Sequence, residues 1–107
     1  MVELQVKHIK TYIYEESEEC FKVYLVLALS NGQFDVDTFE VVLFPEGWWC
    51  EDEATISKRF NDYFSASKYI ESLSSDLIES DIYDPAEAVE TIVEESYRQT
   101  WDLKLLQ

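Results

Sequence analysis

Glycine, proline, cysteine and histidine are all scarce in this chain of 107 residues, which has two glycines, two prolines, two cysteines and one histidine. So few glycines and prolines, without repeats or low-complexity segments, favour one compact domain with short connections. Cys20 and Cys50 show no CxxC spacing and have no histidine cluster beside them. We therefore expect both to pack as small apolar side chains in a reducing compartment.

Motifs that carry out catalysis are missing as well. The sequence contains no Gly-rich phosphate loop, no HExxH pair and no EF-hand loop. His8 lies in a strand-like pattern without an accompanying nucleophile. Acids are so numerous that any carboxylate pair is unspecific, and consecutive acids on a helix diverge rather than converge on a metal ion. The sequence predicts a protein that is not an enzyme and that carries no metal or cofactor.

Basic residues are few: eight Lys and Arg stand against 23 Asp and Glu, for a formal charge of −15. Seven acids and no base lie between Lys22 and Lys58, and nine acids and no base lie between Lys68 and Arg98. Such a surface repels nucleic acids and anionic membranes and attracts a basic protein. The alternative is an acidic surface that serves only solubility or adaptation to salt.

Hydrophobic residues, by contrast, make up 47% of the chain and aromatic residues 15%. That content is sufficient for a folded core, and the length fits a single domain over residues 1–107. The first residues alternate like a strand, without the charged and apolar regions of a signal peptide, and no apolar run approaches a membrane span. The expected location is the cytoplasm.

Alternating apolar residues predict three strands in the first half of the chain. The first covers residues 2–14 with a bend near residues 8–10, the second covers 21–29 and is apolar in both phases, and the third covers 38–44. The second strand should therefore be central in a sheet. Asn31-Gly32 predicts a hairpin, whose outgoing arm changes phase near Asp37; either a bulge lies there or pairing starts only at Thr38.

The second half of the chain is helical in pattern. A short helix is expected after Glu51 from the stripe of Ile56, Phe60 and Phe64, and a second one is expected after a cap at Ser65 or Ser67. Asp84-Pro85 predicts the start of a third helix, and alternation over residues 101–105 predicts a final strand. The predicted class is α+β: a mostly antiparallel sheet, with three N-terminal strands and a C-terminal strand, and two to three helices packed on one face.

A candidate binding surface follows from charge and aromatic content. Pro45 and Gly47 force a turn before Trp48 and Trp49, and neighbouring side chains point opposite ways, so one indole should be buried and the other exposed. Aromatic anchors among carboxylates suit a basic protein partner. The predicted contacts are Glu15, Glu16, Glu18, Glu19, Asp35, Asp37, Trp49, Glu51, Asp52 and Glu53. The row Glu87, Glu90 and Glu94 is the rival surface.

The chain also resembles the bacterial immunity protein 8 family. The matching pieces are the strand from Phe21 to Leu27, the strand that ends in Pro45-Glu-Gly-Trp48, the Tyr- and Glu-containing helix from Tyr69 to Glu79, and the closing segment from Tyr97 to Leu105. By this comparison Trp48 is the buried, structural indole and Trp49 the candidate contact. The Asn31-Gly32 hairpin and Phe44 before Pro45 depart from the pattern of the family.

This resemblance implies a cytoplasmic antitoxin that protects a bacterium from a polymorphic or contact-dependent growth inhibition toxin, commonly a nuclease, by binding it. The protein is expected to be a monomer or a weak dimer, with no direct contact to nucleic acid or membrane. Two other functions remain open: a phage-encoded acidic mimic of nucleic acid that inhibits a host nuclease or repair enzyme, and a small acidic secretion chaperone.

Overall fold

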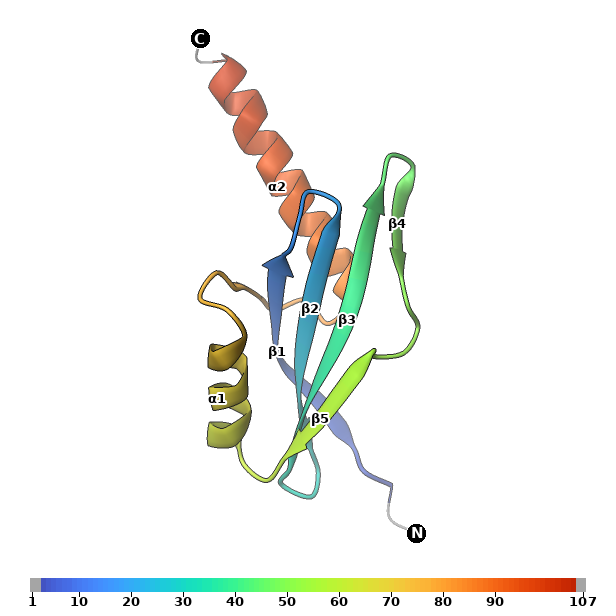
Figure 1. Cartoon of the computed structure of the whole chain (residues 1–107), viewed down its shortest axis with the longest axis vertical. Helices are drawn as coiled ribbons and strands as arrows, with labels where there is room; N and C mark the ends of the chain where they lie inside the picture. Colours follow the sequence, from blue (N-terminus) through green and yellow to red (C-terminus); the bar gives the residue numbers. More distant parts are fainter. Residues whose placement is uncertain (1–2, 106–107) are drawn as a thin grey trace.

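A computed structural model describes the backbone of residues 3–105 and the side chains up to Ser96 (Figure 1). Over that range the elements are strands β1 (Val6–Glu15), β2 (Cys20–Leu29), β3 (Phe34–Phe44), β4 (Gly47–Cys50), β5 (Ile56–Phe60) and β6 (Ile78–Ser80), and helices α1 (Tyr63–Leu73) and α2 (Pro85–Leu105). All paired strands are antiparallel, in the order β4-β3-β2-β1-β6, with β5 also pairing with β3. The predicted α+β class is confirmed.

Strand β2 occupies the centre of the sheet, as its apolar content predicts. Strand β1 pairs with it along its length, with a register shift between His8 and Lys10 at the predicted bend. The β2–β3 hairpin turns at Asn31-Gly32, where Gly32 has a φ of +88°, a left-handed conformation that glycine adopts without a Cβ clash. Both local predictions are therefore confirmed.

Strand β3 contains no bulge near Asp37, and its pairing with β2 begins at Phe34, before Thr38. The register is continuous from Cys20 opposite Val42 to Ala28 opposite Phe34. The apparent change of phase arises because the strand is covered on both faces. Val36 is buried in the cluster under α1, whereas Val41 is buried in the cluster under α2.

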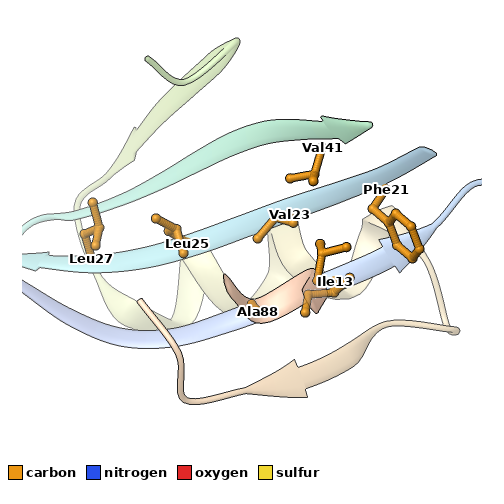
Figure 2. Packing of buried hydrophobic residues seen from close by; sticks show 8 residues of the cluster. Ile13, Phe21, Val23, Leu25, Leu27, Val41 and Ala88 are labelled. Carbon is orange, nitrogen blue, oxygen red and sulfur yellow. The ribbon is translucent and has the colours of Figure 1, made fainter. Parts of the chain in front are cut away.

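The two helices lie on opposite faces of the sheet, not on one face as predicted. Phe21, Val23, Leu25 and Leu27 of β2 share a core with Ile13 and with Ala88 and Val89 of α2 (Figure 2). The intervening Tyr24 and Val26 share a second core with Ala66 and Ile70 of α1. Because successive side chains of a strand point to opposite faces, these two clusters are separated by the sheet. The central strand therefore contributes to two cores.

The short helix expected after Glu51 is instead the edge strand β5. Its residues pair with β3, with Ser57 opposite Asp37 and Arg59 opposite Asp35. The backbone N–H and the hydroxyl of Thr55 both bond the Thr38 carbonyl, at 2.8 and 3.0 Å, and fix the entry into this strand. Pairing with β3 therefore prevails over the helical spacing of the apolar residues.

Helix α1 begins after Asp62, rather than at the predicted Ser65 or Ser67 caps. A carboxylate oxygen of Asp62 accepts a hydrogen bond from the Ser65 backbone N–H at 2.7 Å. This bond lowers the pKa of the Asp62 carboxyl. The helix also ends at Leu73, so the helix from Tyr69 to Glu79 that the family resemblance implies is shorter than expected, and Ile78 begins β6 instead.

A cap with this pKa shift predicts a pH-dependent contribution to stability. Because the pKa of Asp62 is lower in the folded than in the unfolded state, its stabilising effect is present above the unfolded pKa and is lost as pH falls through the folded pKa. Asp62→Ala should therefore lower the melting temperature at neutral pH, and the difference from the unaltered protein should shrink in acid. Melting curves followed by circular dichroism at several pH values test this. A difference that is independent of pH would contradict it.

Helix α2 begins as predicted, with an Asp84 carboxylate oxygen accepting from the N–H groups of Ala86 and Glu87 at 2.9 and 3.3 Å. The helix continues to Leu105 and runs past the end of the sheet (Figure 1). The strand predicted over residues 101–105 is therefore wrong, and this segment is helical. Over residues 3–105, neither helix has a stretch both long and apolar enough to cross a membrane.

Candidate partner-binding groove

Three segments meet at the upper end of the sheet: the β1–β2 turn, the β3–β4 turn and the middle of α2 (Figure 1). The Leu43 N–H donates to the Glu19 carbonyl at 2.7 Å and joins the two turns. Within the first turn, the N–H groups of Glu16 and Ser17 bond the Cys20 carbonyl, and the Ser17 hydroxyl accepts from the Cys20 N–H. The backbone that carries the acidic turn is therefore held in one conformation.

A groove with two lobes lies where these segments meet. The first lobe, of about 440 Å³, is lined by Glu15, Glu18, Phe21, Leu43, Ile92, Val93 and Ser96. The second lobe, of about 510 Å³, is lined by Glu19, Leu43, Phe44, Pro45, Glu46, Gly47, Trp48, Glu90 and Val93. Leu43 and Val93 line both lobes and form the boundary between them. We call the whole feature the acidic groove.

Apolar side chains form the floor of the acidic groove, and carboxylates form its rim. Phe21 belongs to the core under α2, and Leu43, Trp48, Ile92 and Val93 pack against that core. All five rim acids are exposed: Glu15, Glu18, Glu19, Glu46 and Glu90. The described lining residues include no Lys or Arg. Among the described side chains, the groove therefore combines an apolar floor with a rim of carboxylates and no basic lining residue.

Lys22, next to the acidic turn, forms an ion pair with Glu16. Its ammonium lies 3.0 Å from a carboxylate oxygen of Glu16, and this hydrogen bond raises the pKa of Lys22. Glu16 does not line the groove. Of the four acids predicted in this turn region, Glu15, Glu18 and Glu19 therefore remain as rim residues, whereas Glu16 is paired.

The two acidic surfaces that the sequence leaves as rivals meet in this groove. Glu90, from the middle of the predicted row on α2, lines the same lobe as Glu19 from the β1–β2 turn. Glu87 and Glu94 are exposed on α2 outside the lining. The sequence could not show this, because residues 19 and 90 come together only when α2 packs across the sheet.

The two indoles of β4 point to opposite faces of the sheet. Trp48 is paired with Leu43, packs against the core under α2 and lines the groove. Trp49 is paired with Val42 on the other face, where it is 50% exposed. The predicted exposure of Trp49 is confirmed, whereas Trp48, predicted to be buried, is only partly buried. The groove and Trp49, however, lie on different faces, which separates Trp49 from the acids Glu15, Glu18 and Glu19.

Asp35 and Asp37 make side-chain hydrogen bonds to strand β5. Asp35 accepts two hydrogen bonds from the Arg59 guanidinium, at 2.8 and 3.1 Å, and Asp37 accepts one from the Ser57 hydroxyl. These contacts lie along the β3–β5 pair, away from the groove. Both carboxylates therefore accept hydrogen bonds from side chains of the edge strand β5. Arg59, the base that neutralises Asp35, is 24 residues away in sequence.

Glu51, Asp52 and Glu53 are exposed in the loop between β4 and β5. Glu51 and Asp52 line a separate cavity of about 300 Å³, together with Cys50, Tyr83 and Asp84 among others. Burial, followed by the Asp84 charge, raises the pKa of the Cys50 thiol, which keeps it protonated at neutral pH. In the part of the chain that the structure describes, no group of three or more His, Cys, Asp or Glu side chains is placed to hold a metal ion.

The floor of the groove was not predicted as part of a site. The alternation around Leu43 and the helical stripe through Ile92 and Val93 indicate core positions, and their partial exposure depends on where α2 leaves the sheet. Glu46 lies in the turn after Pro45, and only its acidity distinguishes it in the sequence. The groove has to be interpreted from its own chemistry, because no protein-family model, curated protein or solved structure matches this chain.

Proposed function

We propose that this protein is a non-enzymatic immunity protein that binds and neutralises a basic bacterial toxin, such as a nuclease, in the cytoplasm. The observation that carries the proposal is the acidic groove, in which an apolar floor lies beneath five exposed carboxylates. An apolar floor gives binding energy when water is removed from it, and carboxylates orient a basic surface as it approaches.

A nuclease is the class of toxin that fits this surface best. Nucleases hold phosphates with Lys and Arg, so the surface that they present to substrate is positive. A protein with a formal charge of −15 is attracted to such a surface over distances of about a Debye length, roughly 8–10 Å at moderate salt. Binding there would block substrate without any chemistry by the inhibitor.

The proposal predicts a toxin encoded by the neighbouring gene and an association rate that falls with salt. Co-expression of the two products should give a complex that co-purifies, and expression of this protein should rescue growth of cells that carry the toxin. In stopped-flow experiments, the association rate should fall by about tenfold or more as ionic strength increases, because electrostatic steering is screened. A rate that does not respond to salt would contradict the proposed role of the charge.

The same experiments separate the other functions. Absence of a toxin domain beside the gene, together with inhibition of a host nuclease or repair enzyme, would favour a mimic of nucleic acid. An obligate dimer by light scattering, bound to an unfolded effector segment, would favour a secretion chaperone. Either result would overturn the immunity proposal.

A further inference from the structure

We infer that the acidic groove binds one amphipathic segment of the basic partner, which places an apolar side chain in each lobe and Lys or Arg side chains against both rims. This inference rests on the proposed function for the basic character of the partner. It goes further in that it names the recognised segment by its chemistry and assigns the contact to the face that bears α2.

The shape of the groove is the first argument. Two lobes of about 440 and 510 Å³ share Leu43 and Val93 as their boundary. Each lobe is open to solvent and has a volume in the range of clefts that hold small molecules, about 300–1,000 Å³. A single apolar side chain would occupy part of one lobe and leave the other wet. A segment that crosses the Leu43–Val93 boundary with two apolar side chains covers both.

The distribution of charge is the second argument. Glu15 and Glu18 border the first lobe, whereas Glu19, Glu46 and Glu90 border the second. A wholly apolar segment would pass close to these carboxylates without pairing them, which costs desolvation energy. Lys and Arg side chains solve this because their long stems cover apolar surface while their charged ends reach the rim. The segment therefore needs basic residues on both sides of its apolar ones.

The third argument is that the groove is already formed. Leu43 is fixed by its hydrogen bond to Glu19 and by pairing with Trp48 in β4. Val93 is carried by α2, whose first turns are anchored by the Asp84 cap and by the fully buried Ala88 and Val89. Little ordering of the protein is then required on binding, which favours affinity.

Charge reversal at each lobe tests the rim. The variants are Glu15→Lys/Glu18→Lys for the first lobe and Glu46→Lys/Glu90→Lys for the second, with Glu3→Lys/Asp76→Lys, outside the groove and the predicted contacts, as the control. All three make the same change in net charge, and all six residues are exposed. Binding is measured by fluorescence anisotropy with a labelled synthetic peptide in which lysines flank two leucines. Each groove variant should weaken binding by roughly tenfold at low salt, and the control should weaken it far less.

The floor is tested with a second peptide and a second pair of variants. A peptide with serines in place of the leucines, but the same lysines, should bind the unaltered protein more weakly. Leu43→Ala should reduce binding of the leucine peptide and leave binding of the serine peptide unchanged. If Leu43→Ala melts at a much lower temperature, Val93→Thr tests the floor instead, because it replaces one apolar methyl group by a hydroxyl group.

The inference is overturned if the control weakens binding as much as the groove variants do, or if the two peptides bind equally. A toxin that co-purifies with the groove variants as well as with the unaltered protein would overturn it while leaving the proposed function intact. Peptide binding as expected, without a toxin in co-expression, would instead overturn the proposed function alone. The two failures are therefore distinguishable.

Discussion

Ile13→Ala is expected to lower the free energy of unfolding by about 2–5 kcal/mol, as is usual when a large aliphatic side chain is removed from a close-packed core. Ile13 is fully buried on β1, paired with Val23 of β2 and Ile78 of β6, and it packs in the core that Ala88 of α2 closes (Figure 2). Because three elements surround this side chain, the cavity left by alanine cannot collapse easily. Urea titration followed by circular dichroism measures the loss.

The matched control is Ile56→Ala on the edge strand β5. Ile56 is 50% exposed, so its truncation removes few contacts, and the expected cost is about 1 kcal/mol or less. Equal losses for the two variants would contradict the location of the core. A loss confined to Ile13→Ala supports the packing of α2 on the β1–β2 pair.

Thr11→Val is expected to destabilise the protein by about 1–3 kcal/mol, because it leaves two polar partners facing a methyl group. Thr11 is fully buried; its hydroxyl donates to the Ile82 carbonyl and lies 2.8 Å from the His8 Nε2. Since the hydroxyl proton goes to the carbonyl, His8 must donate through Nε2–H, which fixes its tautomer. This network ties the bend of β1 to the segment that leads into α2.

Thr11→Ser is the control for that variant. It retains the hydroxyl and loses one methyl group, so its expected cost is about 1 kcal/mol. Nuclear magnetic resonance of the imidazole should show the Nε2–H tautomer in the unaltered protein and in Thr11→Ser, and a change in Thr11→Val. If the two variants lose the same stability, packing of the methyl group, and not the hydrogen bonds, would explain the effect.

Local signals were sufficient for much of the fold. The Asn31-Gly32 hairpin, the bend after His8 and the start of α2 at Pro85 are each specified by residues next to one another in sequence. The central position of β2 followed from its apolar content in both phases. These local signals do not specify which element covers each face of the sheet. The sequence therefore predicts both helices on one face, whereas the structure has one on each.

Two segments show why periodicity alone is not decisive. Ile56 and Phe60 have helical spacing, but Arg59 and Ser57 lie between them and pair with acids on β3. Conversely, residues 101–105 alternate like a strand and belong to α2. In the first segment a tertiary pairing overrides the local pattern, and in the second an established helix continues through it.

The sequence predicts the chemical character of the candidate site but not the full set of residues that line it. Net charge pointed to a basic partner, and three of the predicted contacts, Glu15, Glu18 and Glu19, line the groove. The sequence does not distinguish the paired Asp35 from these groove acids, because Arg59 comes close to Asp35 only through the pairing of β3 with β5. The contribution of Glu90 and of Leu43 likewise depends on the position of α2.

The placement of the rim carboxylates has a consequence for how such a protein can change over generations. Four of them stand at the end of β1 or in turns and the fifth on the outside of α2, so none supplies a side chain to either core. Exposed substitutions of this kind usually alter stability by about 0.5 kcal/mol or less. Under the proposed function, the specificity of the groove could therefore follow a changing partner by single substitutions, while the sheet and the two cores beneath it stay the same.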